Sequence, residues 1–244
     1  MCFLDKKGEI YMENINYEAC QMCNFEVHKS ILIVVSDNDK LTDNSPTGVW
    51  LEEFAIPYNA FVDKGYEITV ASPNGGQIPI DTDSDSDNWE IAKNVLKHTR
   101  RLSSVDYDRY SALFLPGGHG PMFDLCNNEL LGKIIINFNR KNKLIGAICH
   151  GPAGLLSAAD NGVPFVKGRK LTCFTNEEEF YFQKESKIPY FLEDALKNSG
   201  ANFVQGGISE VNVVEDGNLI TAQNYCSTGI FTEKILKYLD NRQG

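Results

Sequence analysis

The sequence predicts an α/β protein, a three-layer sandwich in which helices cover both faces of a mostly parallel sheet. Short apolar runs alternate with stretches of helical period along most of the chain, which is the pattern of parallel strands joined by helices. No internal repeat or linker marks a second domain. We therefore expect one α/β domain over residues 30–244, preceded by an N-terminal extension or cap over residues 1–29, where the sequence is polar and aperiodic.

The expected elements follow from the hydrophobic period, in chain order. Apolar runs predict strands, at 31–35, 67–71, 111–115, 143–148, 170–174 and 201–204. Amphipathic stretches predict helices, at 47–64, 128–139, 152–159, 177–183, 190–199 and 227–239. The first helix ends at Gly65, and a long polar loop occupies 73–88. The turn 215–218, Glu-Asp-Gly-Asn, joins strands 211–214 and 219–221 into a hairpin.

The composition limits the classes of function. Hydrophobic residues make up 42% and charged residues 23%, so the chain can bury a sizeable core. The net charge of −10 argues against nucleic acid and anionic membrane as partners, because both bind positively charged protein surfaces. No apolar run reaches the roughly 18 residues of a membrane span, and the N-terminal segment lacks the order of a signal peptide. With seven scattered cysteines, an odd number, we expect a cytoplasmic protein with free thiols.

The strongest chemical signal is Cys149, which follows an apolar strand in the run Ala147-Ile-Cys-His-Gly151. A nucleophile on a sharp strand-to-helix turn needs small residues two positions away on each side, and Ala147 and Gly151 meet this need. Such a turn directs backbone N–H groups at an oxyanion, and the helix N-terminus favours thiolate over thiol. The sequence therefore predicts a nucleophile elbow at Cys149 rather than a structural cysteine.

The histidines exclude two enzyme classes. Only four occur, at positions 28, 98, 119 and 150. A Cys-His glutaminase or an α/β-hydrolase needs a base downstream of its nucleophile, and no histidine follows His150. A histidine that assists Cys149 must therefore be His150 or His119.

Two further segments support a site at this edge of the sheet. Gly117-Gly-His-Gly120 follows a buried strand, and its glycines let backbone amides approach a ligand as the second half of an oxyanion hole. Glu52 and Glu53 lie about 100° apart around the predicted helix, so only one of them can face inward. The residues alone do not decide between the two.

Two patterns of metal-ligand residues are incomplete. The acidic run 81–87 lacks the glycine and the final glutamate of an EF-hand, so we expect a solvated loop. Cys20 and Cys23 have the spacing of half a zinc site, but no second pair follows. We therefore expect neither a metal nor an organic cofactor.

Five ordered segments resemble the DJ-1/PfpI superfamily. They are Thr47-Gly-Val-Trp-Leu-Glu-Glu53, Ala71-Ser-Pro-Asn-Gly-Gly76, Pro116-Gly-Gly-His-Gly120, Ala147-Ile-Cys-His-Gly-Pro-Ala153 and Phe174-Thr-Asn-Glu-Glu-Glu179. They look most like the heat-shock-protein-31 branch, the glutathione-independent glyoxalases (glyoxalase III). The resemblance implies the flavodoxin-like, class I glutamine amidotransferase-like fold with a nucleophile elbow, from about residue 31 to the C-terminus.

The resemblance also implies catalytic roles. Cys149 would be the nucleophile, His150 its partner and Glu53 the inward carboxylate beside the sulfur. Glu179 would be the acidic member of a Cys-His-Glu triad, although Glu177 and Glu178 are close enough for a shift of position. The backbone of Gly118 and His150 would form the oxyanion hole.

The same resemblance places Gly117, His119 and Asn224 at the substrate pocket. Where the family often has Asn-Pro in the last strand-to-helix loop, this chain has Asn224-Tyr225-Cys226. A different substrate shape and a second thiol near the pocket are expected from this departure.

These resemblances imply an enzyme of the glyoxalase III (D-lactate dehydratase) type, a lyase or hydrolase. It would convert α-oxoaldehydes such as methylglyoxal to hydroxy acids through a cysteine hemithioacetal, and deglycation would use the same thiol. Its partners would be a small carbonyl substrate and a second copy of the chain in a homodimer. The alternatives are a stress-response holdase chaperone, a redox sensor and a PfpI-type cysteine amidase or peptidase.

Overall fold

The computed structural model describes residues 3–4, 10–11 and 29–242. Most of the expected extension over 1–29, including Cys20 and Cys23, lies outside the described residues. Within it, β1 (Phe3–Leu4) and β2 (Ile10–Tyr11) pair antiparallel.

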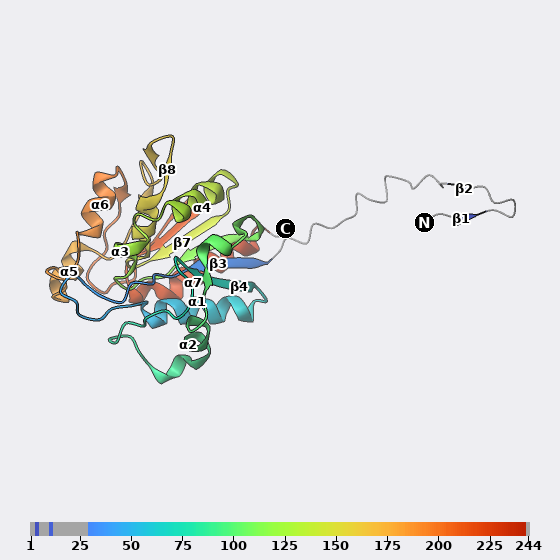
Figure 1. Ribbon diagram of the computed structural model, residues 1–244. Coiled ribbons are helices and arrows are strands. Elements are labelled where there is room, and N and C mark those ends of the chain that lie inside the picture. The colour runs from blue at the N-terminus through green and yellow to red at the C-terminus, as the bar shows by residue number, and fades with distance from the viewer. Residues whose placement is uncertain (1–2, 5–9, 12–28, 243–244) are drawn as a thin grey trace.

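A seven-stranded sheet forms the centre of the molecule (Figure 1). Its order is β12-β13-β7-β6-β3-β4-β5, and every neighbouring pair is parallel except β12 with β13. The strands are β3 (Ser30–Val34), β4 (Glu67–Ser72), β5 (Arg100–Arg101), β6 (Ala112–Leu115), β7 (Leu144–Ile148), β12 (Val213–Asp216) and β13 (Leu219–Ala222). The strand order reverses between β3 and β6, and ligands bind beyond the carboxyl ends of the strands at such a point.

Alternate side chains of each strand pack against helices on opposite faces of the sheet. Ile31 and Ile33 of β3 face one buried cluster, which includes residues of α1 (Leu51–Asp63), α2 (Glu90–Leu96) and α7 (Thr228–Asp240). Leu32 and Val34 face the other cluster, which includes residues of α3 (Pro121–Asp124), α4 (Glu129–Arg140) and α6 (Leu192–Asn198). The predicted three-layer arrangement with a mostly parallel sheet is therefore confirmed.

Some elements differ from the sequence prediction. The first helix begins at Leu51 rather than at residue 47, because the chain before it is extended and Val49 forms a β-bridge with Ile80. The helix expected over 152–159 is the 3₁₀ helix η5 (Gly151–Ser157). The strands expected at 170–174 and 201–204 are only two residues each, β10 (Lys170–Leu171) and β11 (Asn202–Phe203), and they pair with each other outside the main sheet.

The short elements were missed by the sequence analysis. Helix α2 has seven residues and buries only Ala92 and Leu96, which is too few for a readable period. The others are α3, the two-residue strands β1, β2 and β5, the hairpin of β8 (Ala159–Asp160) and β9 (Val163–Pro164), and the 3₁₀ helices η2 (Asp87–Trp89), η3 (Leu102–Ser104), η4 (Tyr107–Arg109) and η6 (Tyr225–Ser227). The expected hairpin is present, as is the helix after residue 175, α5 (Asn176–Tyr181).

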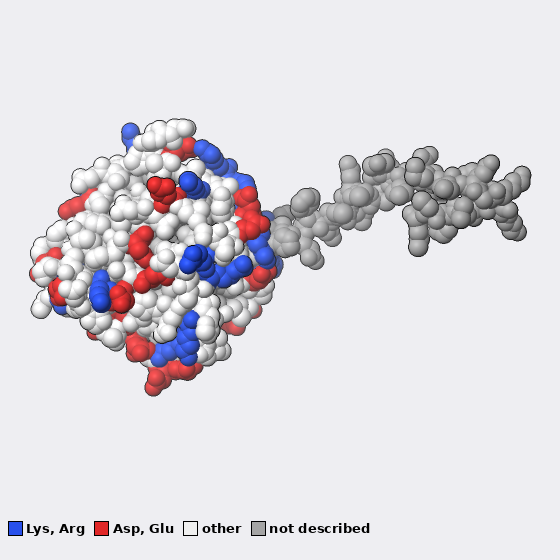
Figure 2. Space-filling model, in the orientation of Figure 1, with Lys and Arg blue, Asp and Glu red and all other residues white. Residues whose placement is uncertain are grey.

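The charges on the face shown in Figure 2 are interspersed, and no broad basic patch appears there among the described residues. None of the helices in the described part of the chain is long and apolar enough to cross a membrane.

Candidate active site

Cys149 lies at a sharp turn between β7 and η5. Its φ is +58°, in the left-handed region that a residue with a side chain adopts at a cost of about 1–3 kcal/mol. The turn leaves no room beside it: Ala147 is fully buried, and a Cβ on Gly151 would lie 2.1 Å from the carbonyl oxygen of Leu115. The backbone N–H of Cys149 donates to the carbonyl of Ala222 on β13, at 2.9 Å. The structure therefore contains the strand-to-helix elbow expected from the small-x-Cys-x-small pattern.

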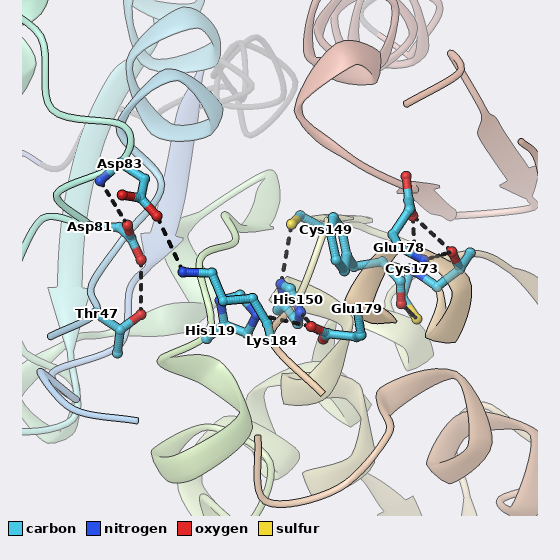
Figure 3. A network of polar contacts seen from close by, with 12 residues as sticks. Thr47, Asp81, Asp83, His119, Cys149, His150, Cys173, Glu178, Glu179 and Lys184 are labelled. Atoms are coloured by element: carbon cyan, nitrogen blue, oxygen red, sulfur yellow. Dashed lines mark hydrogen bonds and ion pairs between the residues drawn. The ribbon is translucent and has the colours of Figure 1, made fainter. Parts of the chain in front are cut away.

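His150 connects the sulfur to a carboxylate (Figure 3). Its Nδ1 lies 3.2 Å from Sγ of Cys149, and its Nε2 lies 2.7 Å from Oε1 of Glu179. An ionised carboxylate only accepts hydrogen bonds, so the Nε2 proton faces Glu179 and the Nδ1 lone pair faces the sulfur. Burial and the neighbouring His119 lower the pKa of His150, against the effect of Glu179. The imidazole is thus held in the neutral form that a general base requires.

Both oxygens of Glu179 are occupied by histidines. Nε2 of His119 lies 3.3 Å from Oε2, and the two imidazole rings pack with their centroids 4.0 Å apart. Burial alone would raise the pKa of Glu179, but the two histidines outweigh it and bring the pKa to about 2. These three side chains also place ligand-type atoms within 4.8 Å of one another, so they are the group of described residues that could hold a metal ion.

The three consecutive glutamates at the start of α5 have different surroundings. Thr175 and Glu178 form a capping box, in which each side chain accepts the backbone N–H of the other, at 3.1 and 3.0 Å. Glu177 is exposed and lies beside Gln205. Glu179 is the one of the three that contacts His150. The Thr-x-x-Glu signature is a readable signal in the sequence that assigns Glu178 to the cap and leaves Glu179 for the site.

Glu53 is fully buried on α1, whereas Glu52 is exposed. A Cβ on Gly117 would lie 2.3 Å from Oε2 of Glu53 and 2.6 Å from Cβ of Cys149, so the carboxyl and the thiol meet against this glycine. Burial raises the pKa of Glu53 to about 8, although the nearby Cys149 thiol and Gly117 N–H oppose the rise. Neither carboxyl oxygen has a partner at hydrogen-bond geometry among the described residues. The side chain therefore carries its proton at neutral pH in most molecules.

The protonation of Cys149 corrects one expectation. Burial raises the pKa of the thiol well above its ordinary value, and the Glu53 carboxyl adds to the rise, while the Gly118 N–H lowers it. From the sequence, the N-terminus of the following helix is expected to favour the thiolate. A seven-residue 3₁₀ helix provides only a short dipole, and the desolvation of a cysteine that is only 5% exposed outweighs it. The resting sulfur is thus a thiol with the neutral His150 within reach.

The sulfur faces a cavity of about 250 Å³. Gly118, His119 and Glu53 line it together with Cys149 and His150. Among its remaining walls, only Tyr225 lies on a segment, 224–226, that the sequence placed beside the pocket; the full set is Trp50, Asp83, Phe174, Phe182, Lys184 and Tyr225. Four of these are aromatic, and Trp50 stacks on Tyr225 with ring centroids 5.8 Å apart. The cavity is small and largely apolar, with charged groups contributed by Asp83 and Lys184.

Two expectations about the pocket are corrected. Gly117 lies behind Glu53 and Cys149 and is not part of the lining. Asn224 is also outside the lining, and its Nδ2 donates to Oε1 of Glu178 at 2.7 Å, so it ties the last loop to α5. Tyr225 borders the cavity in its place, and the following Cys226 is exposed.

The acidic run 81–87 is not simply solvated. Asp81 is buried, where it accepts hydrogen bonds from the Thr47 hydroxyl at 3.0 Å and from the Asp83 backbone N–H at 3.1 Å. These bonds fix the exposed Asp83 beside the cavity, where it contacts Lys184.

The parallel sheet and the cysteine at its strand-to-helix turn define an α/β protein of the nucleophile-elbow class. Residues 45–238 match the DJ-1/PfpI family, and the chain belongs to that family. Glyoxalase 3 of Candida albicans is 30% identical to it in an alignment that covers 80% of this chain and 92% of the relative. Glutathione-independent glyoxalase HSP31 of Saccharomyces cerevisiae is 28% identical, covering 82% and 92%. The X-ray structure of Rapid Encystment Protein 24 KDa from Francisella tularensis has a TM-score of 0.81 and 34% identity, covering 84% of this chain and 96% of that one.

Proposed function

We propose that this protein is a glutathione-independent glyoxalase, which converts α-oxoaldehydes such as methylglyoxal to 2-hydroxy acids. The observation that carries the proposal is the buried Glu53, whose pKa of about 8 lies near the working pH and whose carboxyl packs against the Cys149 thiol. A carboxyl with such a pKa can both take and return a proton. The glyoxalase relatives in the family support the same reaction.

The first step joins Cys149 to the aldehyde carbon. The sulfur forms a bond to that carbon while the S–H proton passes to Nδ1 of His150 and from there to the aldehyde oxygen. The backbone N–H of Gly118 lies next to the sulfur, where it can stabilise charge on that oxygen. The product of this step is a neutral hemithioacetal.

The second step moves a hydrogen between adjacent carbons. The ionised fraction of Glu53 removes the proton from the former aldehyde carbon, and the electron pair forms the enediolate. A proton moves from the first oxygen to the second, and Glu53 returns its proton to the second carbon, which leaves a thioester. Water then hydrolyses the thioester to lactate and restores the thiol. The first carbon is oxidised and the second is reduced, so no external oxidant or reductant is needed.

The cavity supports this chemistry over the alternatives. Its volume of about 250 Å³ suits a molecule of a few heavy atoms, and four of its lining residues are aromatic. A redox sensor needs an accessible thiolate, whereas burial raises the pKa of Cys149. Deglycation of α-oxoaldehyde adducts would use the same groups.

The test is lactate production from methylglyoxal without glutathione. We expect the Cys149→Ala variant to lose activity at least 1,000-fold and Glu53→Gln about 100-fold or more, with the exposed Glu52→Gln as a matched control that keeps it. Because Glu53 must be ionised to take the proton, kcat/KM should rise about tenfold from pH 6 to pH 7 and level off above about pH 8. No lactate from the wild type, or undiminished lactate from Cys149→Ala, contradicts the proposal. Suppression of client aggregation that survives Cys149→Ala would instead support the chaperone alternative.

A further inference from the structure

Lys184 contributes a cation to a cavity that is otherwise lined mainly by aromatic rings. Of the described residues in that lining, it is the one with a permanently positive side chain. Its Nζ lies 3.2 Å from Oδ2 of Asp83, and the two side chains are 27% and 61% exposed, respectively. Figure 3 shows the ammonium group of Lys184 directed at Asp83. A charged group in this position bears directly on which substrates enter.

The position of Lys184 is set by the helix that carries Glu179. Gln183 has a φ of +56°, which ends the turn after α5 and reverses the chain. The backbone N–H of Lys184 then donates to the carbonyl of Glu179, at 2.9 Å. The turn that places a carboxylate against His150 therefore also places an ammonium group over the cavity.

The contact between Lys184 and Asp83 is easily exchanged. Ion pairs between partly exposed side chains contribute little, on the order of 0.2–1 kcal/mol, and Asp83 keeps most of its hydration. A carboxylate bound within the cavity would lie closer to the aromatic walls, where a charge-assisted hydrogen bond to the ammonium is stronger than at the surface. Methylglyoxal is neutral, so it offers the ammonium group a carbonyl oxygen at most and no charged partner.

We propose that Lys184 is a specificity-determining residue, and that the substrate is a short α-oxoaldehyde that carries a carboxylate at its other end. The aldehyde faces Cys149 and the carboxylate binds Lys184 in place of Asp83. A single ammonium group suits a carboxylate better than a phosphate, which needs more donors. Asp83 then acts as a competitor for Lys184, which disfavours anions that cannot displace it. The turnover part of this inference rests on the proposed glyoxalase reaction, whereas the binding part does not.

Two variants distinguish this role from that of a bridge that merely closes the cavity. We would measure kcat/KM for 4,5-dioxopentanoate, which carries a carboxylate, and for the neutral methylglyoxal. The preference is the kcat/KM for 4,5-dioxopentanoate divided by the kcat/KM for methylglyoxal. Lys184→Met should lower this ratio about tenfold. Asp83→Asn should raise it about two- to threefold, because the competing carboxylate is gone. Lys184→Arg should retain most of the preference. Lys187→Met is the control, since Lys187 pairs with Asp43 at 3.6 Å and does not line the cavity.

The signs of the two effects decide the question. A bridge that only closes the cavity is broken by either variant, so both would shift the ratio in the same direction, and that result overturns the proposal. An unchanged ratio in Lys184→Met overturns it as well.

A binding measurement keeps this inference separate from the proposed reaction. We would titrate each protein with 4-oxopentanoate, an unreactive carboxylate of similar size, and with neutral pentan-2-one, following the shifts by NMR. We expect Lys184→Met to weaken the binding of 4-oxopentanoate about tenfold and to leave the binding of pentan-2-one unchanged. Asp83→Asn should strengthen the binding of 4-oxopentanoate. Lys184-dependent binding without turnover of either aldehyde refutes the glyoxalase reaction but supports the anion site. Turnover of methylglyoxal without any Lys184-dependent preference refutes the anion site alone.

Discussion

The Glu53→Gln variant is expected to gain stability relative to the wild type as the pH rises, and to lose the proposed activity. The wild-type carboxyl has a pKa of about 8 in the folded protein and 4.5 ordinarily. Between these values the folded state holds a proton that the unfolded state has released. An acidic side chain whose pKa is raised on folding therefore destabilises the folded state progressively from about pH 4.5 to about pH 8.

The size of the effect follows from the two pKa values. Because one pH unit of difference corresponds to about 1.4 kcal/mol, the full cost at pH 8 and above is about 5 kcal/mol. Between pH 5 and pH 7.5 the wild type should lose about 3 kcal/mol through Glu53, and the Glu53→Gln variant should not. The packing and hydrogen-bonding effects of glutamine itself do not depend on pH, so they cancel in the comparison of the two pH values. For a chain of this size, about 3 kcal/mol corresponds to roughly 6–12 °C in Tm.

The assay is urea unfolding of both proteins at pH 5 and at pH 7.5, checked by thermal melts. The upper limit of pH 7.5 lies below the range in which the thiols of the unfolded chain ionise. Glu52→Gln is the control, because this neighbour on the same helix is exposed. If the free energies of unfolding of Glu53→Gln and wild type differ by the same amount at both pH values, within about 1 kcal/mol, the folded carboxyl is ionised at both. That result would refute the raised pKa of Glu53.

Two further predictions concern the groups around the sulfur. Gly117→Ala should destabilise the protein by about 2–3 kcal/mol in urea and lower kcat/KM at least 100-fold, because its Cβ would lie 2.3 Å from Oε2 of Glu53 and 2.6 Å from Cβ of Cys149. Wild-type stability would show that the contact relaxes without cost. Glu179→Gln should lower kcat/KM about 100- to 1,000-fold, because it removes the ionised acceptor of the Nε2 proton of His150, whereas the exposed Glu177→Gln should have no effect. Equal lactate production by both variants would contradict the orientation assigned to His150.

The parts of the site that could be predicted are those encoded within a few residues of sequence. The elbow at Cys149 depends on Ala147 and Gly151, two positions away on each side, so its signature is local. The strands β3, β6 and β7 in the middle of the sheet are buried on both faces and read as continuous apolar runs. The choice between Glu52 and Glu53 needed either the family pattern or the packing of α1 against the sheet.

The parts that could not be predicted depend on contacts between distant segments. The aromatic walls come from the start of α1, the loop before α5, the residue after it and the last loop, and no local pattern marks them. Asn224 was assigned to the pocket, but its amide is used by Glu178, 46 residues away in the chain. The raised pKa of Cys149 follows from its burial and from Glu53 rather than from its position before a helix. β10 and β11 were read as longer strands, although each pairs over only two residues.

The position of Glu179 and Lys184 on one short segment limits how the protein can diverge. An insertion or deletion in α5 would rotate both residues at once, because the Lys184 N–H is bonded to the Glu179 carbonyl. A change in α5 that moves the ammonium group of Lys184 therefore also disturbs Glu179, the partner of His150. Asp83 lies on a separate loop that is anchored by the buried Asp81, so its side chain can vary while the anchor keeps the loop in place. New substrate preferences should thus arise first at Asp83, because Asp81 and Ser84 on the same loop bond to Thr47 and to the start of α1 and are less free to change.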